Sequence, residues 1–227
     1  MPTFPQASTI KTTGLLVALT RRDDQSNFCA MARRDTRDLL IAEGLKAFLA
    51  RGYEGIGIQP ILSGAGVPKG SFYNFFPSKE AYALEVIDAY AARYEAFRLA
   101  CFATDGPPLR RLRHYFEALE AEMAEAGETG GCLYGVLAQT SAPHSEALRS
   151  RLKAAFAHWR AQIADLLETA KAAGELAPAT ESVALADAII DAYEGAAVRA
   201  RAEGDTAPMR RFRRVTMEAL LSAATMP

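Results

Sequence analysis

Apolar residues recur every three or four positions from Thr36 onward, and this helical period is the feature that most constrains the fold. The first example is a single helical face formed by Leu40, Ile41, Leu45 and Phe48. No run of alternating polar and apolar residues between turn signals predicts a convincing strand. We therefore expect an all-α protein.

Glycine and proline divide this pattern into about nine helices, three short and six mostly long. Gly52 should end the first helix through a left-handed backbone, and Gly66 should permit a tight turn. After the first helix, which begins near Thr36, the expected helices are 58–65, 69–75, 79–102, 109–126, 132–140, 145–173, 181–203 and 206–224.

Composition places the chain among ordinary globular proteins. Half of its 227 residues are hydrophobic and 23% are charged, which excludes collagen, disorder throughout and a disulfide scaffold. The 26 Lys and Arg nearly balance the 27 Asp and Glu, so any basic surface must be local. The longest uncharged apolar run near the start, 14–19, is far shorter than the roughly 18 residues of a membrane span. We expect a cytoplasmic protein without a signal peptide or membrane partner.

Residues 1–33 are rich in Thr, Ser, Gln and Pro and show no sustained period, which predicts a flexible N-terminal tail. Met31 directly precedes Ala-Arg-Arg, so an alternative is that translation begins there. Two domains should follow the tail, at 34–80 and 81–227.

The cysteines and histidines show no metal-binding or catalytic spacing. Cys29, Cys101 and Cys132 contain no CxxC pair, and the three histidines form neither HxxxH nor HExxH. We therefore predict no disulfide framework, no metal and no cofactor. No pair of nucleophile and base can be assembled from the spacing, so the chain is not expected to be an enzyme.

Residues 57–80 carry the clearest functional signal. A short helix, a turn at Gly66 and a second short helix form a helix-turn-helix, whose second helix can lie in the DNA major groove. The inner faces would be buried by Ile61, Leu62, Ala65, Val67 and Phe72.

The second short helix would then present polar groups to DNA. The groups suited to phosphates and base edges are Lys69, Gly70, Ser71, Tyr73 and Asn74, with Lys79 at the start of the next helix. Residues 1–80 contain 10 Lys and Arg against 7 Asp and Glu, a net charge of +3, whereas 81–227 has a net charge of −4. The alternative is a plain helical bundle whose basic residues only face solvent.

The run AGVPKGSFYNFFPSKE, residues 65–80, resembles the signature of TetR-type transcriptional repressors, and ARGYEGIGIQPIL before it fits their first two helices. The resemblance implies that Lys69 and Ser71 face bases and that Tyr73 and Lys79 bind phosphate. Two positions depart from the family: Pro68 replaces the usual capping Ser or Thr, and Phe75 replaces a frequent His.

The same resemblance implies a homodimer that binds double-stranded operator DNA and is released by a small-molecule inducer. In the family the last two helices, here 181–203 and 206–224, pack against the partner's copies as a four-helix bundle. Gly195, Ala196 and Ala197 would allow close approach. The helix 79–102, which would touch both domains, is the natural lever for the inducer.

A narrower resemblance lies in GGCLYGVLAQTS, residues 130–141, which is similar to the TetR-type subgroup that responds to acrylate, N-ethylmaleimide and other electrophiles, the NemR and AcuR kind. In that subgroup a Gly-Cys pair opens the sixth helix, matching Gly131 and Cys132. A helix N-terminus favours a thiolate, which would make Cys132 a good nucleophile. The alternative is a small inert core cysteine.

The ligand site is expected among aromatic and polar residues of the middle helices. From Tyr90, Tyr94, Tyr115, Phe116, Tyr134, Gln139, Trp159 and Tyr193, most of which should be plain core, we select Tyr134 and Trp159, together with Glu194 beside Cys132. The rival function is a helical-bundle enzyme or small-molecule carrier with Cys132 as its nucleophile.

Overall fold

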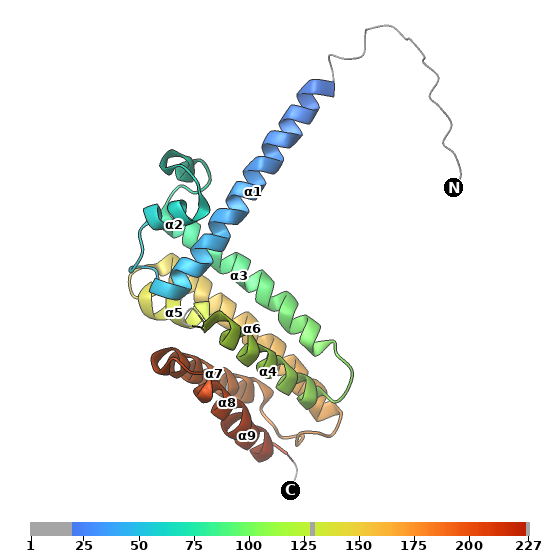
Figure 1. The fold of residues 1–227 in the computed structure, drawn as a ribbon. Helices are drawn as coiled ribbons and strands as arrows, with labels where there is room; N and C mark the ends of the chain where they lie inside the picture. The colour runs from blue at the N-terminus through green and yellow to red at the C-terminus, as the bar shows by residue number, and fades with distance from the viewer. Residues whose placement is uncertain (1–19, 128–129, 226–227) are drawn as a thin grey trace, which may run out of the picture. The chain divides into compact units, whose positions relative to one another are not determined.

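The computed structural model describes residues 20–127 and 130–225, with side chains from residue 35 onward. These residues form helices and no strand, which confirms the predicted all-α class (Figure 1). The chain divides into two compact units, 1–38 and 39–227, and the second contains every site considered below.

The described helices follow the predicted order along the chain. They are α1 (Thr20–Arg51), α2 (Ile58–Ala65), the 3₁₀ helix η1 (Lys69–Asn74), α3 (Lys79–Phe102), α4 (Pro108–Ala126), α5 (Leu133–Thr140), α6 (Glu146–Ala172), α7 (Ser182–Glu203), α8 (Ala207–Arg211), the π-helical turn η3 (Phe212–Thr216) and α9 (Met217–Ala223).

Helix α1 begins at Thr20, earlier than the expected Thr36, and so includes part of the predicted tail. An apolar period identifies only helices that bury one face. Residues 20–35 lack that period but contain no Gly or Pro to end a helix. The rest of the predicted tail, 1–19, lies outside the described residues.

The predicted left-handed backbone at Gly52 and tight turn at Gly66 are confirmed. Gly52 and Gly66 adopt left-handed φ angles of 69° and 66°. Gly57 caps the start of α2, and Ser78 accepts a hydrogen bond of 3.0 Å from the backbone N–H of Ala81 at the start of α3. The turns that orient η1 were therefore readable from the sequence.

Tyr82 joins the short helices to the start of α3. Its buried ring packs against the rings of Phe48, Phe72 and Phe76, and its hydroxyl donates a hydrogen bond of 2.5 Å to the carbonyl of Leu40. A Cβ at Gly44 would collide with the Tyr82 hydroxyl, so this position of α1 needs glycine. One side chain thus holds α1, η1 and α3 together.

Helices α3, α4, α6 and α7 pack into the bundle that forms most of the unit, and the C-terminal helices cover α7 (Figure 1). The buried apolar core is continuous from Leu40 to Leu221. None of the described helices combines the length and apolar character needed to span a membrane.

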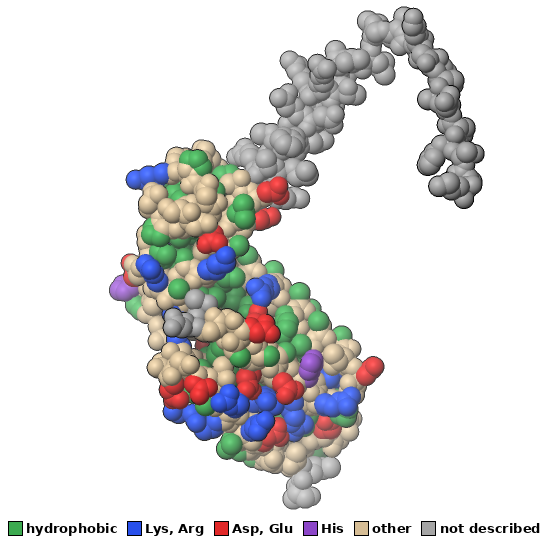
Figure 2. All heavy atoms as spheres, in the orientation of Figure 1, with side chains coloured by type: hydrophobic (Ala, Val, Ile, Leu, Met, Phe, Trp, Pro, Cys, Tyr) green, Lys and Arg blue, Asp and Glu red, His purple; other side chains and the backbone are tan. Residues whose placement is uncertain are grey.

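The last predicted helix, 206–224, is present but contains the π-helical turn η3 between α8 and α9. On this part of the surface Arg213 contacts Glu117 and Glu120, and Arg113 pairs with Glu218 at 2.7 Å. Figure 2 shows basic and acidic side chains intermixed over the region of α4 and the C-terminal helices. The π turn could not be predicted because periodicity does not resolve one inserted residue.

Candidate functional site

Helix η1 is anchored by one buried side chain and exposes most of the others. Phe72 is fully buried, in an edge-on contact with the Tyr82 ring at 5.3 Å. Tyr73 is 64% exposed, so its phenol is available for contacts with a binding partner while the neighbouring Phe72 fixes the helix to the core. The remaining predicted contacts also lie at the surface, with Lys69, Gly70 and Asn74 exposed and Ser71 half-buried.

The two departures from the family pattern have visible local effects. Pro68 is the N-cap of η1 and supplies no side-chain hydrogen bond, while its carbonyl accepts 2.9 Å from the N–H of Ser71. Phe75 is half-buried and packs near Phe76, with ring centroids 6.3 Å apart. The helix is therefore closed by backbone bonds and packing instead of a polar cap.

Lys79 is directed toward the protein. Its Nζ donates a hydrogen bond of 2.5 Å to the carbonyl of Tyr53 and lies 4.2 Å from the centre of the Tyr53 ring. Burial lowers the pKa of the Lys79 ammonium. The resemblance implies that this cation binds phosphate, but in the structure its charge is already engaged by the turn after α1.

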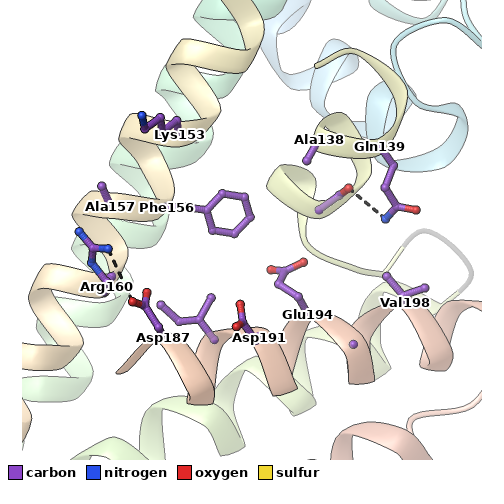
Figure 3. Close-up of a pocket in the computed structure, with 13 residues that line it drawn as sticks. Ala138, Gln139, Lys153, Phe156, Ala157, Arg160, Asp187, Asp191, Glu194 and Val198 are labelled. Carbon is purple, nitrogen blue, oxygen red and sulfur yellow. Dashed lines mark hydrogen bonds and ion pairs between the residues drawn. The ribbon is translucent and has the colours of Figure 1, made fainter. Parts of the chain in front are cut away.

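A pocket of about 710 Å³ lies between α5, α6 and α7 (Figure 3). Its volume is within the usual range for small-molecule sites. The lining residues are Gly135, Ala138, Gln139, Lys153, Phe156, Ala157, Arg160, Asp187, Ile190, Asp191, Glu194, Gly195 and Val198.

Glu194 is the polar group most perturbed in this pocket. The pKa of its carboxyl is raised to about 7, chiefly by burial and also by the charge of Asp191, while a hydrogen bond from Cys132 opposes the rise. Its Oε1 atom is buried and has no hydrogen-bond partner among the described residues. The sequence-selected Glu194 therefore does line a cavity.

A second pocket of about 270 Å³ adjoins the first and reaches the end of α1. The two share Gly135, Gln139, Glu194 and Val198, and the second also includes Cys132 and residues 50–52. A Cβ at Gly135 would collide with the Glu194 carboxylate, so the missing side chain lets this carboxylate approach α5.

Cys132 stands at the N-cap of α5, as expected, but it is buried. Burial raises the pKa of its thiol well above the ordinary value, and the nearby Glu194 adds to the rise. The Tyr90 hydroxyl donates to Sγ at 3.8 Å. Burial therefore acts against the thiolate that a helix N-terminus favours, which supports the alternative of a core cysteine.

Tyr134 and Trp159 lie behind the wall of the larger pocket. Both are buried, and both pack on Phe156, with ring centroids 5.5 Å and 6.3 Å away. Phe156 itself lines the pocket, so the two sequence-selected aromatics support the lining and do not form it. Trp159 also meets Tyr193 edge-on at 5.5 Å.

Most of the charged lining was not predicted from the sequence. Asp187, Asp191 and Glu194 share one face of α7, and Lys153 and Arg160 share one face of α6. Their i, i+4 and i, i+7 spacing was a readable signal. What spacing could not show is that these two faces border the same cavity.

Side chains from α5 and α7 hold the end of α1. Arg201 donates to the carbonyls of Leu49 and Ala50, the latter at 2.6 Å. Thr140 accepts a hydrogen bond of 3.1 Å from the N–H of Tyr53. These contacts join the pocket-lining helices to the helix that carries α2 and η1, and we call them the α1 latch.

No group of three or more His, Cys, Asp or Glu is positioned to hold a metal ion within residues 35–127 and 130–225. Cys101 and Cys132 are both free thiols, and the side chain of Cys29 lies outside the described residues.

Comparison with known proteins agrees with this geometry. Residues 40–86 match the family model described as bacterial regulatory proteins, tetR family, and residues 108–216 match the tetracyclin repressor-like C-terminal domain. The first match covers α2 and η1, and the second covers the pocket-forming helices.

Two relatives and one solved structure extend the match across the chain. HTH-type transcriptional repressor DhaR of Mycobacterium sp. (strain GP1) is 36% identical over 84% of this chain and 95% of its own. Transcriptional regulator AcuR of Cereibacter sphaeroides is 36% identical over 77% of this chain and 80% of its own. The crystal structure of regulatory protein TetR from Rhodobacter sphaeroides is 34% identical with a TM-score of 0.76, covering 80% of this chain and 96% of that one. The chain therefore belongs to the TetR family of bacterial transcriptional regulators.

Proposed function

We propose that this regulator is a repressor that binds a palindromic operator as a homodimer and is released by a small-molecule inducer in the cytoplasm. The observation that carries the proposal is the exposed polar face of η1 above the buried Phe72 anchor. A DNA-recognition helix needs one buried face and one exposed polar face, because base and phosphate contacts must form without disturbing the core.

Five residues of η1 are assigned to the DNA surface. Lys69 and Tyr73 supply the longest exposed polar groups, and Ser71 and Asn74 supply shorter donors and acceptors. Gly70 has open space around it, so the backbone of η1 can approach DNA closely there. Lys79 is assigned a supporting contribution, since it fixes the turn at Tyr53 beside this surface.

A homodimer is supported by exposed apolar side chains on the C-terminal helices. Val183 is exposed on α7, and Val215 is exposed on η3, although most large apolar residues of these helices are buried. Two-fold symmetry would place two copies of η1 about 34–36 Å apart, or a multiple of that distance, along one face of a duplex.

The inducer is assigned to the pocket between α5, α6 and α7, with Glu194 as its main polar contact and Cys132 at the adjoining cavity. Occupancy would lower operator affinity by the free energy with which the ligand prefers a conformation unsuited to DNA. A conformational change at the pocket can reach η1 through the α1 latch, because Arg201 and Thr140 belong to the pocket-forming helices and contact the end of α1. Helix α3 provides a second connection.

The raised pKa of Cys132 favours this non-covalent response over the nucleophilic alternative. At neutral pH the buried thiol stays protonated, and the thiol is a far weaker nucleophile than the thiolate. An inducer that binds reversibly requires no such activation.

A gel-shift experiment tests the DNA assignment. The wild-type protein should retard the DNA upstream of its own gene, and Lys69→Ala combined with Tyr73→Ala should weaken binding at least about tenfold, because two exposed polar contacts are lost from each subunit. Lys171→Ala is the matched control, because this lysine lies at the end of α6 and pairs with Glu168. Equal binding by the double variant and the control would contradict the assignment.

A further inference from the structure

Glu194 lines the larger pocket, and one oxygen of its carboxylate has no hydrogen-bond partner among the described residues. Figure 3 shows Asp191 and Glu194 rising from α7 into the space below α5. Glu194 Oε1 is buried and accepts no hydrogen bond among the described residues, although Cys132 donates a hydrogen bond to this carboxylate. A buried carboxylate oxygen without a donor is costly, so a ligand that supplies one gains free energy there.

The charges around the pocket favour a positive ligand. The guanidinium of Arg160 lies 3.6 Å from a carboxylate oxygen of Asp187, so the charges of these two residues largely cancel at one end of the pocket. Asp191 and Glu194 remain, against the exposed Lys153 at the edge of α6. Figure 3 shows Lys153 well separated from the two carboxyl groups, which leaves them as the dominant charge near the pocket floor.

The remaining lining is apolar and aromatic. Phe156, Ala157 and Ile190 form a surface on which a hydrocarbon or aryl body can rest, and Ala138 adds to it from α5. A ligand that fits must therefore combine an apolar body with a compact group able to donate hydrogen bonds to carboxylates.

We propose that this pocket binds an organic ammonium ion, with Glu194 as the carboxylate that recognises its positive charge. Asp191 adds a second negative charge, and the apolar body lies against Phe156 and Ile190. The inference rests on the proposed function in one respect, since it gives the chemical class of the inducer assigned to the same pocket.

Three probes with one hydrocarbon body separate charge from apolar contact: 4-phenylbutylamine, 4-phenylbutan-1-ol and 4-phenylbutanoate. Isothermal titration of the full chain at pH 7.5 should give a Kd for the ammonium about tenfold or more below that of the alcohol, with the anion weakest. Glu194→Gln should weaken the ammonium about tenfold or more and leave the alcohol unchanged, because the amide keeps the shape and removes the charge.

Two further variants test whether the effect is specific to Glu194. Asp191→Asn should weaken the ammonium to a smaller extent, because Asp191 is exposed and its charge is screened. Glu181→Gln is the matched control, since Glu181 precedes α7 outside the pocket and its loss should leave all three affinities unchanged. Thermal melting of each variant confirms that it is folded before titration.

Equal affinity of wild type for the ammonium and the alcohol would overturn the proposal, and so would full ammonium binding by Glu194→Gln or failure of wild type to bind the ammonium. These titrations need no DNA, whereas the gel shift needs no ligand. Loss of the ammonium site with intact operator binding would therefore refute this inference and leave the proposed repressor function standing.

Discussion

At the scale of single residues, the chemistry of this protein depends on burial more than on residue type. Cys132 and Glu194 were both selected from the sequence, yet burial raises both of their pKa values. For the thiol this disfavours the thiolate form, whereas for the carboxyl it raises the pKa to about 7. Residue identity was predictable, but the direction of each pKa shift depends on packing that one sequence does not reveal.

Glu194 should make the stability of the protein depend on pH between about 4.5 and 7. Its folded-state pKa, about 7, lies above its ordinary value of 4.5, so the folded state holds the proton more tightly. The stabilisation is complete below pH 4.5 and is lost as the pH rises to 7. Wild type should therefore lose up to about 3 kcal/mol relative to Glu194→Gln across this range.

Urea unfolding of both proteins at several pH values measures this difference. The remaining carboxyl groups are common to both proteins and cancel in the comparison. A difference in unfolding free energy that stays constant from pH 4.5 to 7.5 would show that Glu194 is not held in a proton-retaining site.

At the scale of secondary-structure elements, sequence signals located the short helices well. The bounds of α2 agree with the predicted 58–65 because Gly57 and Gly66 stand at its two ends. The start of α1 was missed, because a helix without an apolar face leaves no periodic signal. The pocket was missed in large part because it depends on which face of α6 meets which face of α7, and that is a tertiary relationship.

The α1 latch should hold the end of α1 against local opening. Arg201→Ala removes the hydrogen bonds to the Leu49 and Ala50 carbonyls and should speed hydrogen exchange of the backbone amides from 49 to 53. Arg199→Ala is the matched control, because Arg199 pairs with Glu203 on its own helix. Mass-spectrometric hydrogen exchange measures both, and equal rates in the two variants would show that the latch carries no local stability.

At the scale of the whole molecule, the proposed function requires a two-subunit assembly. The described chain is consistent with that form, since Val183 and Val215 are 54% and 61% exposed on α7 and η3. An operator bound by two reading helices gains affinity because the second contact is intramolecular. A substitution that disrupts the dimer should therefore also lower the affinity for the operator.

Val183→Glu combined with Val215→Glu should convert the protein to monomers, because a carboxylate buried at a subunit contact is strongly unfavourable. Leu99→Glu is the control, since Leu99 is 50% exposed on α3, away from the C-terminal helices. Sedimentation velocity should give a monomer for the double variant and a dimer for the control, with operator affinity falling only in the former. A dimeric double variant would place the subunit contact elsewhere.

The open surroundings of Gly70 make η1 adaptable. No atom lies within 4 Å of a Cβ built at Gly70, and its backbone carries no left-handed φ. New side chains can therefore be introduced at this position without disturbing Phe72 or the core beneath it. In the proposed DNA-binding mode, a substitution there would exchange close backbone approach for a new side-chain contact and would leave the core unchanged.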